Sequence, residues 1–157
     1  MHSPALSLYL LDDSAPSPTL HRVETLLPAG FPSPADDYLE DRIDLNRELV
    51  HNPASTFLAR VRGESMRDAG MQDGDLILID RSKTPQSGSM VLAWVDGGFT
   101  VKHLILHNNR AFLCAANPEY PDLELNEEED NRIWGVVTHV IHKEETRRPN
   151  PGRPQGP

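Results

Sequence analysis

The feature that most constrains the fold is a series of short apolar segments, separated by turn residues, that follows Pro53. The segments expected to form strands are Phe57–Arg62, Leu76–Ile79, Met90–Val95, Phe99–Leu106, Arg110–Ala116 and Trp134–His142. Short strands at a spacing of about ten residues, with turn chemistry between them, are typical of antiparallel sheets. The glycine-containing turn Asp96-Gly97-Gly98 predicts a hairpin. The chain is therefore predicted to be mostly β, with a single curved antiparallel β domain.

The region before these strands is predicted to hold one short helix and an extended N-terminal arm. Asp44 can cap a helix over Leu45–Val50, which Pro53 then ends. Residues 1–28 contain four prolines and keep neither helical nor strand periodicity for long, which indicates a loosely ordered arm. We therefore expect a flexible arm over residues 1–35, a folded domain over 36–143, and a disordered, proline-rich tail over 144–157.

Length and charge narrow the classes of function. A chain of 157 residues suits one domain with a core of its own. The formal net charge of −9 repels phosphate, so direct sequence-specific DNA binding is not expected. No apolar stretch approaches the roughly 20 residues that cross a bilayer, and the first residues lack the pattern of a secretory signal. These features predict a cytoplasmic protein that does not use a membrane.

Cysteine and histidine usage gives no sign of a metal site or a cofactor. Cys114 is the single cysteine and lies in an apolar run, so we expect a small core residue. His139 and His142 are an odd number of positions apart on a strand, so they are expected to face opposite ways. The acidic run Glu127–Asp130 is expected to be a solvated loop.

The sequence Gly63-Glu64-Ser65-Met66 closes the first apolar segment and opens a turn that ends at Gly74. A serine in such a place most often caps a short helix, here over Met66–Ala69. As a nucleophile it would need a base, and none of the seven histidines has neighbours that suggest a Ser-His-Asp arrangement. Both interpretations of Ser65 stay open on these residues alone.

Lys102 is the candidate base, because it lies in the second strand of the predicted hairpin. Strand alternation places it on one face with Thr100 and Leu104, and either this face or the opposite one must face the core. A lysine in a strand is more often exposed or at an edge. If Lys102 faces inward, the loss of hydration lowers its pKa, and a neutral amine can remove a proton from a hydroxyl.

These residues together resemble a known family, the self-cleaving Ser-Lys peptidase domain of the LexA and UmuD group. The residues that carry the resemblance are Gly63–Met66, Asp68, Met71, Asp73-Gly74-Asp75 and Phe99–Lys102. The upstream segments Ala29–Tyr38 and Arg42–Asn46 resemble the UmuD form. Motifs at both ends of the region from about residue 29 to 140 make this resemblance far more specific than a lone Gly-Glu-Ser-Met.

The resemblance implies roles for individual residues. It makes Ser65 the nucleophile, Lys102 its general base, and Ala29-Gly30 the bond that is cut. The negative charge that develops on the Ala29 carbonyl oxygen would need backbone N–H donors near Ser65, and Met66 is the candidate contributor.

The resemblance also implies a cellular role. LexA-type repressors carry a helix-turn-helix domain before the cut, whereas 29 residues rich in proline precede it here. The UmuD form implies a homodimer that cleaves itself when stimulated by RecA on single-stranded DNA. It then serves a UmuC-type error-prone translesion polymerase in the SOS response. The alternatives are a phage- or LexA-type regulator without its own DNA-binding domain, and a dimeric binding module that lacks the chemistry.

Overall fold

The computed structural model describes residues 7–10, 19–21, 42–126 and 129–144. The expected cleavage site Ala29-Gly30, most of the expected arm, residues 127–128 of the acidic run, and the tail from residue 145 lie outside these ranges. In the described part, no helix is both long and apolar enough to cross a bilayer.

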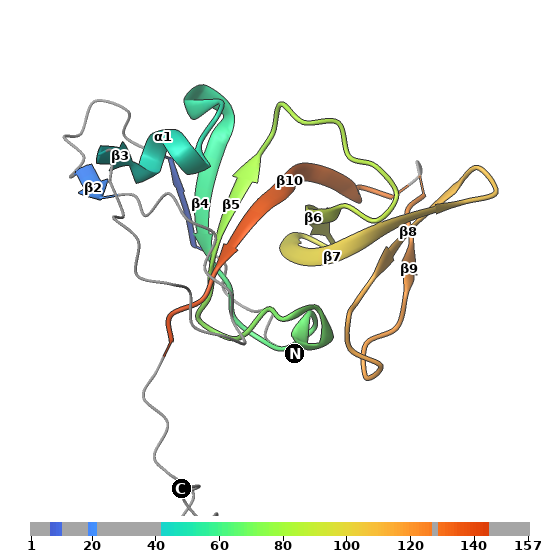
Figure 1. The fold of residues 1–157 in the computed structure, drawn as a ribbon. Helices are drawn as coiled ribbons and strands as arrows, with labels where there is room; N and C mark the ends of the chain where they lie inside the picture. The colour runs from blue at the N-terminus through green and yellow to red at the C-terminus, as the bar shows by residue number, and fades with distance from the viewer. Residues whose placement is uncertain (1–6, 11–18, 22–41, 127–128, 145–157) are drawn as a thin grey trace, which may run out of the picture.

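An antiparallel sheet of eight strands, in the order β1-β4-β5-β10-β6-β7-β8-β9, dominates the fold and curves strongly around the core (Figure 1). Its strands are β1 (Ser7–Leu10), β4 (Thr56–Arg60), β5 (Leu76–Asp80), β6 (Met90–Val95), β7 (Gly98–His107), β8 (Arg110–Cys114), β9 (Leu123–Glu124) and β10 (Arg132–Ile141). Strands β2 (Thr19–His21) and β3 (Arg42–Asp44) form a separate pair. The helical elements are α1 (Leu45–Leu49) and the 3-10 turns η1 (Pro53–Ser55) and η2 (Arg67–Ala69). The prediction of a mostly β antiparallel domain is confirmed.

Local turn and cap chemistry accounts for the elements that the sequence predicted. In the β6–β7 hairpin, Val95 pairs with Gly98, and both turn residues, Asp96 (φ 49°) and Gly97 (φ 80°), have positive φ. Two positive φ angles are what a tight hairpin turn requires. The Asp44 side chain accepts a hydrogen bond of 3.0 Å from the Asn46 N–H, so the predicted cap of α1 is confirmed.

Both faces of the sheet are buried, in two separate clusters. One cluster contains Ala59, Val61, Met66, Met71, Ile77, Ile79, Leu92 and Val101. The other contains Val91, Ala93, Leu104 and Leu113. Strand β5 is buried on both faces, as its continuous apolar run predicted. Both faces of β7 meet a core, because Val101 and Leu104 enter different clusters.

Three further expectations need correction. Strands β1 and β2 lie within residues 1–28, where no strand was predicted. Strand β1 pairs with β4, and pieces of three or four residues are too short to show periodicity. Helix α1 ends at Leu49, one residue before the predicted end. Cys114 is half-buried rather than a core residue, because Leu113 fills the core and its neighbour faces the other side of the sheet.

A buried carboxylate joins the start of β4 to the end of β5. Asp80 accepts hydrogen bonds from the Ser55 hydroxyl at 2.9 Å and from the Asn52 side-chain amide at 2.9 Å. The backbone and hydroxyl of Ser82 donate two more, at 2.8 and 2.7 Å. Burial raises the pKa of Asp80, but the hydrogen bonds from Asn52, Ser82 and Ser55 outweigh it and lower the pKa to about 2.

This carboxylate predicts an acid-dependent loss of stability. Its folded pKa lies below its unfolded value, so its contribution is complete above about pH 4 and is lost as the pH falls through about 2. We expect the free energy of unfolding in urea to lose on the order of 2 kcal/mol from this group over that window. Asp80→Asn should lack this acid-dependent loss of stability, whereas Asp130→Asn, a change at an exposed position, should keep it. Equal acid sensitivity of Asp80→Asn and the unsubstituted protein would contradict the assignment.

Candidate active site

Ser65 lies in the loop of residues 61–75, which connects β4 to β5. The loop is closed by backbone hydrogen bonds between Val61 and Asp75 (2.9 Å) and between Gly74 and Val61 (2.8 Å). The Gly63 N–H donates to the Asp73 carboxylate at 2.8 Å. Met66 and Met71 project from the loop into the core and are each only 2% exposed. Both ends and the middle of the loop are therefore fixed.

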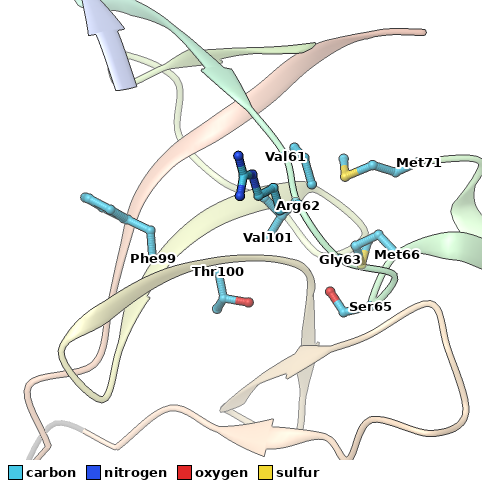
Figure 2. A pocket seen from close by; sticks show the side chains of 9 residues that line it. All are labelled: Val61, Arg62, Gly63, Ser65, Met66, Met71, Phe99, Thr100 and Val101. Carbon is cyan, nitrogen blue, oxygen red and sulfur yellow. The ribbon is translucent and has the colours of Figure 1, made fainter. Parts of the chain in front are cut away.

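The Ser65 side chain lines a small pocket between this loop and the start of β7 (Figure 2). The residues around it are Val61, Arg62, Gly63, Ser65, Met66, Met71, Phe99, Thr100 and Val101. Figure 2 shows the hydroxyl groups of Ser65 and Thr100 pointing toward each other across this space. A small pocket with two hydroxyl groups in its lining is a suitable place for a small side chain of an extended segment.

The Ser65 hydroxyl is not a helix cap. The 3-10 turn η2 begins after Met66 and has no side-chain cap. Within the described ranges, the Ser65 hydroxyl makes no hydrogen bond to another protein group. The capping interpretation is therefore wrong, and the hydroxyl is available for a substrate or a base.

Lys102 lies on β7 and is half-buried. Its ammonium group donates a hydrogen bond of 3.0 Å to the Thr100 hydroxyl and lies 5.5 Å from the centre of the Tyr120 ring. Burial lowers the pKa of Lys102 from its usual value. The lysine thus has the property that a general base needs, namely a neutral form that is reached more easily than for a lysine in water.

Thr100 connects the two predicted catalytic side chains. It lines the same pocket as Ser65, and its hydroxyl accepts the hydrogen bond from Lys102. Among the described residues there is no direct hydrogen bond between Ser65 and Lys102. The sequence placed Thr100 on the same strand face as Lys102 but assigned it no role, although a hydroxyl two residues before a candidate base is a recognisable signal.

Two backbone donors beside Ser65 have no acceptor among the described residues. The N–H groups of Arg67 and Asp68 donate to Glu64 at 3.1 Å and Ala116 at 2.7 Å. In the part of the chain that the structure describes, the N–H groups of Ser65 and Met66 donate to no protein acceptor. Adjacent free amides next to a hydroxyl can stabilise a negatively charged oxygen.

Among the described residues, the other reactive side chains lie outside the Ser65 pocket. Burial and the nearby Asp122 raise the pKa of the Cys114 thiol, which reduces its thiolate fraction. His142 lies 2.7 Å from the Asp75 carboxylate, and His139 contacts the Thr138 hydroxyl at 3.0 Å. The described residues include no group of three or more side chains able to hold a metal ion.

Comparison with known proteins gives matches over most of the chain. The family model described as peptidase S24-like matches residues 23–138. Protein ImpA of Escherichia coli is 49% identical over 116 residues, which cover 73% of this chain and 78% of ImpA. Protein SamA of Salmonella typhimurium is 47% identical over 116 residues, covering 74% and 80%. The LexA repressor of Xylella fastidiosa is 37% identical over 124 residues, covering 79% of this chain and 56% of the repressor.

Proposed function

Since this chain belongs to the peptidase S24-like family, we propose that it is a UmuD-like serine peptidase that cuts its own arm between Ala29 and Gly30. Ser65 is the nucleophile and Lys102 is its general base. The observation that carries the proposal is the partly desolvated Lys102 amine, bonded to a hydroxyl that shares a pocket with the free hydroxyl of Ser65.

The first half of the reaction forms an ester. Neutral Lys102 accepts the proton of the Ser65 hydroxyl as the oxygen attacks the carbonyl carbon of Ala29. The N–H groups of Ser65 and Met66 donate to the oxyanion that results. When this intermediate collapses, the bond to the Gly30 nitrogen breaks, and the protonated Lys102 gives its proton to the departing amine.

Water completes the reaction. Lys102, neutral again, removes a proton from a water molecule that attacks the ester between Ser65 and Ala29. The products are a carboxylate at Ala29, a regenerated Ser65 hydroxyl and a new N-terminus at Gly30. Thr100 supports this cycle by holding the amine next to the pocket. Catalytic hydrogen bonds commonly tighten when substrate enters, so contact between Lys102 and Ser65 is expected on binding of the arm.

The wider role that we propose is that of UmuD in SOS mutagenesis. The processed homodimer would act in the cytoplasm as the accessory subunit of a UmuC-type translesion polymerase, after stimulation by RecA on single-stranded DNA. Similarity to ImpA and SamA over about three quarters of the chain supports this assignment over a repressor. The net charge of −9 favours recruitment through proteins rather than direct contact with DNA.

The position of the cut bond can be tested by substitution at Gly30. Gly30→Glu places bulk and charge beside a narrow site, so we expect processing to slow by at least about 100-fold. Gly152→Glu makes the same change in the tail and should leave the rate unaltered. Intact-mass spectrometry over an alkaline time course would measure both. An unchanged product from Gly30→Glu would place the bond elsewhere.

A further inference from the structure

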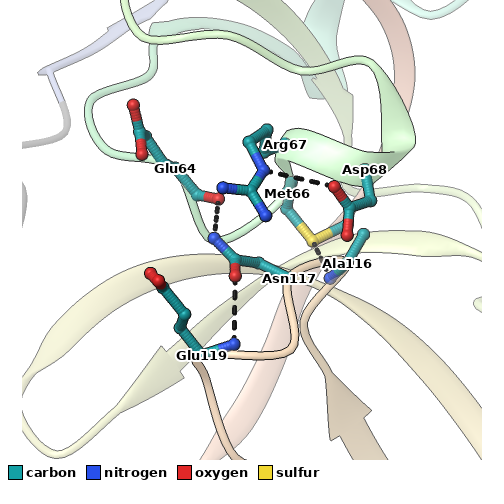
Figure 3. Close-up of polar contacts among 7 residues, drawn as sticks. All are labelled: Glu64, Met66, Arg67, Asp68, Ala116, Asn117 and Glu119. Carbon is teal, nitrogen blue, oxygen red and sulfur yellow. Dashed lines mark hydrogen bonds and ion pairs between the residues drawn. The ribbon is translucent and has the colours of Figure 1, made fainter.

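Residues 116–120, here called the clamp segment, follow β8 and lie against the Ser65 loop (Figure 3). The Ala116 carbonyl accepts the Asp68 N–H at 2.7 Å. The Ala116 N–H donates to the Met66 sulfur at 3.4 Å. The side-chain amide of Asn117 donates to the Glu64 carbonyl at 2.8 Å. The clamp segment therefore contacts the loop on both sides of Ser65.

Asn117 is the buried centre of these contacts. It is only 2% exposed, and its side-chain oxygen accepts the Glu119 N–H at 3.0 Å while its nitrogen donates to Glu64. An amide that is buried and bonded at both ends has little freedom to rotate. The Glu64 carbonyl is therefore held from two sides, by the Asn117 amide at 2.8 Å and by the Arg67 N–H at 3.1 Å.

The peptide that Asn117 holds is the one that joins Glu64 to Ser65. A peptide group is planar and trans, so its carbonyl and its N–H point in opposite directions. Fixing the Glu64 carbonyl toward Asn117 therefore fixes the direction of the Ser65 N–H, which is one of the two free donors beside the nucleophile. If this peptide rotated, one donor to the oxyanion would be lost.

We propose that Asn117 is a positioning residue, which sets the Glu64–Ser65 peptide so that the Ser65 N–H faces the developing oxyanion. This inference rests on the proposed function. The same clamp segment carries Tyr120, whose ring lies 5.5 Å from the Lys102 nitrogen, so one short stretch contacts both halves of the proposed dyad. Neither residue was singled out from the sequence.

Asn117→Asp tests the proposal with little change in shape. The carboxylate keeps an acceptor for Glu119 but replaces the donor to Glu64 with a repelling oxygen. We expect the self-cleavage rate per folded molecule to fall by roughly 10- to 100-fold. Asn117→Ala, which adds no charge near Lys102, should show the same loss with no shift of the pH at which the rate levels off.

Asn131→Asp is the matched control. Asn131 also uses both ends of its amide, accepting from the Asp96 N–H at 3.2 Å and donating to Glu129 at 2.7 Å, but it lies away from the pocket. The self-cleavage rate of Asn131→Asp should equal that of the unsubstituted protein. The folded fraction of every variant is measured by circular dichroism and urea titration under the cleavage conditions.

The outcomes separate this proposal from the function on which it rests. If the unsubstituted protein does not cleave itself at alkaline pH, the proposed function fails. If it does cleave, and both Asn117 variants keep its rate per folded molecule, the positioning role is overturned. Loss of the fold in both variants would give Asn117 a structural role only, which also overturns the proposal.

Discussion

Alanine at Ser65 or at Lys102 is expected to leave a folded, full-length protein whose self-cleavage is slower by at least about 1,000-fold. Ser65→Ala removes the atom that attacks the Ala29 carbonyl, and no hydroxyl replaces it. Lys102→Ala removes the group that takes the serine proton. Because the two residues act in one step, the double variant should be no slower than the slower single variant.

The measurement is the fraction of full-length chain over time at alkaline pH, by intact-mass spectrometry. Lys83→Ala is the matched control for the lysine, since Lys83 is exposed and lies outside the pocket. Ser65→Ala should unfold in urea at no lower concentration than the unsubstituted protein, because Ser65 makes no side-chain hydrogen bond in the described structure. Lys102→Ala loses the hydrogen bond to Thr100 but also removes a desolvated cation, so its urea midpoint should stay close to that of the unsubstituted protein. Processing at the normal rate in either variant would refute the dyad.

The second large effect expected is a dependence of the self-cleavage rate on pH. The active form contains neutral Lys102, so the rate should rise about tenfold per pH unit while the pH is well below the pKa of this lysine. Because burial lowers the pKa of Lys102, the rise should level off below the value of an ordinary lysine. Initial rates between pH 7 and pH 10, in the absence of any activating protein, would show this profile.

The sign of the effect on stability provides a control. The folded state binds this proton less tightly than the unfolded chain, so Lys102 opposes folding at neutral pH, and this cost diminishes as the pH rises. A rate that increased merely because the fold loosened would be accompanied by lower stability in urea at the higher pH. A rate that stays flat between pH 7 and 10 would contradict the need for a neutral lysine.

The main strands and the short helix could be predicted because their signals are local. The β6–β7 hairpin is determined locally, by the Asp96-Gly97 turn and the residue on either side of it. Likewise, Asp44 caps α1 with its own side chain. Strand β1 could not be found in this way, because its partner β4 begins more than forty residues later and the pairing uses backbone groups. Such pairing leaves no trace in the pattern of side chains.

The same distinction holds within the candidate site. Alternation along β7 predicted that Lys102 shares a face with Thr100, and their hydrogen bond confirms this placement. The expectation that an inward-facing Lys102 has a lowered pKa agrees with its burial. Asn117, by contrast, contacts Glu64 across 53 positions of sequence, and nothing near either residue indicates the partner. Contacts that depend on how the sheet curves become visible only in three dimensions.

The mass of the purified protein after incubation at alkaline pH shows whether this chain is a peptidase that acts on itself. We expect a shorter chain whose N-terminus is Gly30, formed by the unsubstituted protein and absent from Ser65→Ala treated in parallel. A mass that stays at full length would refute self-cleavage. So would the same shortened product from Ser65→Ala, because the cut would then come from another protease.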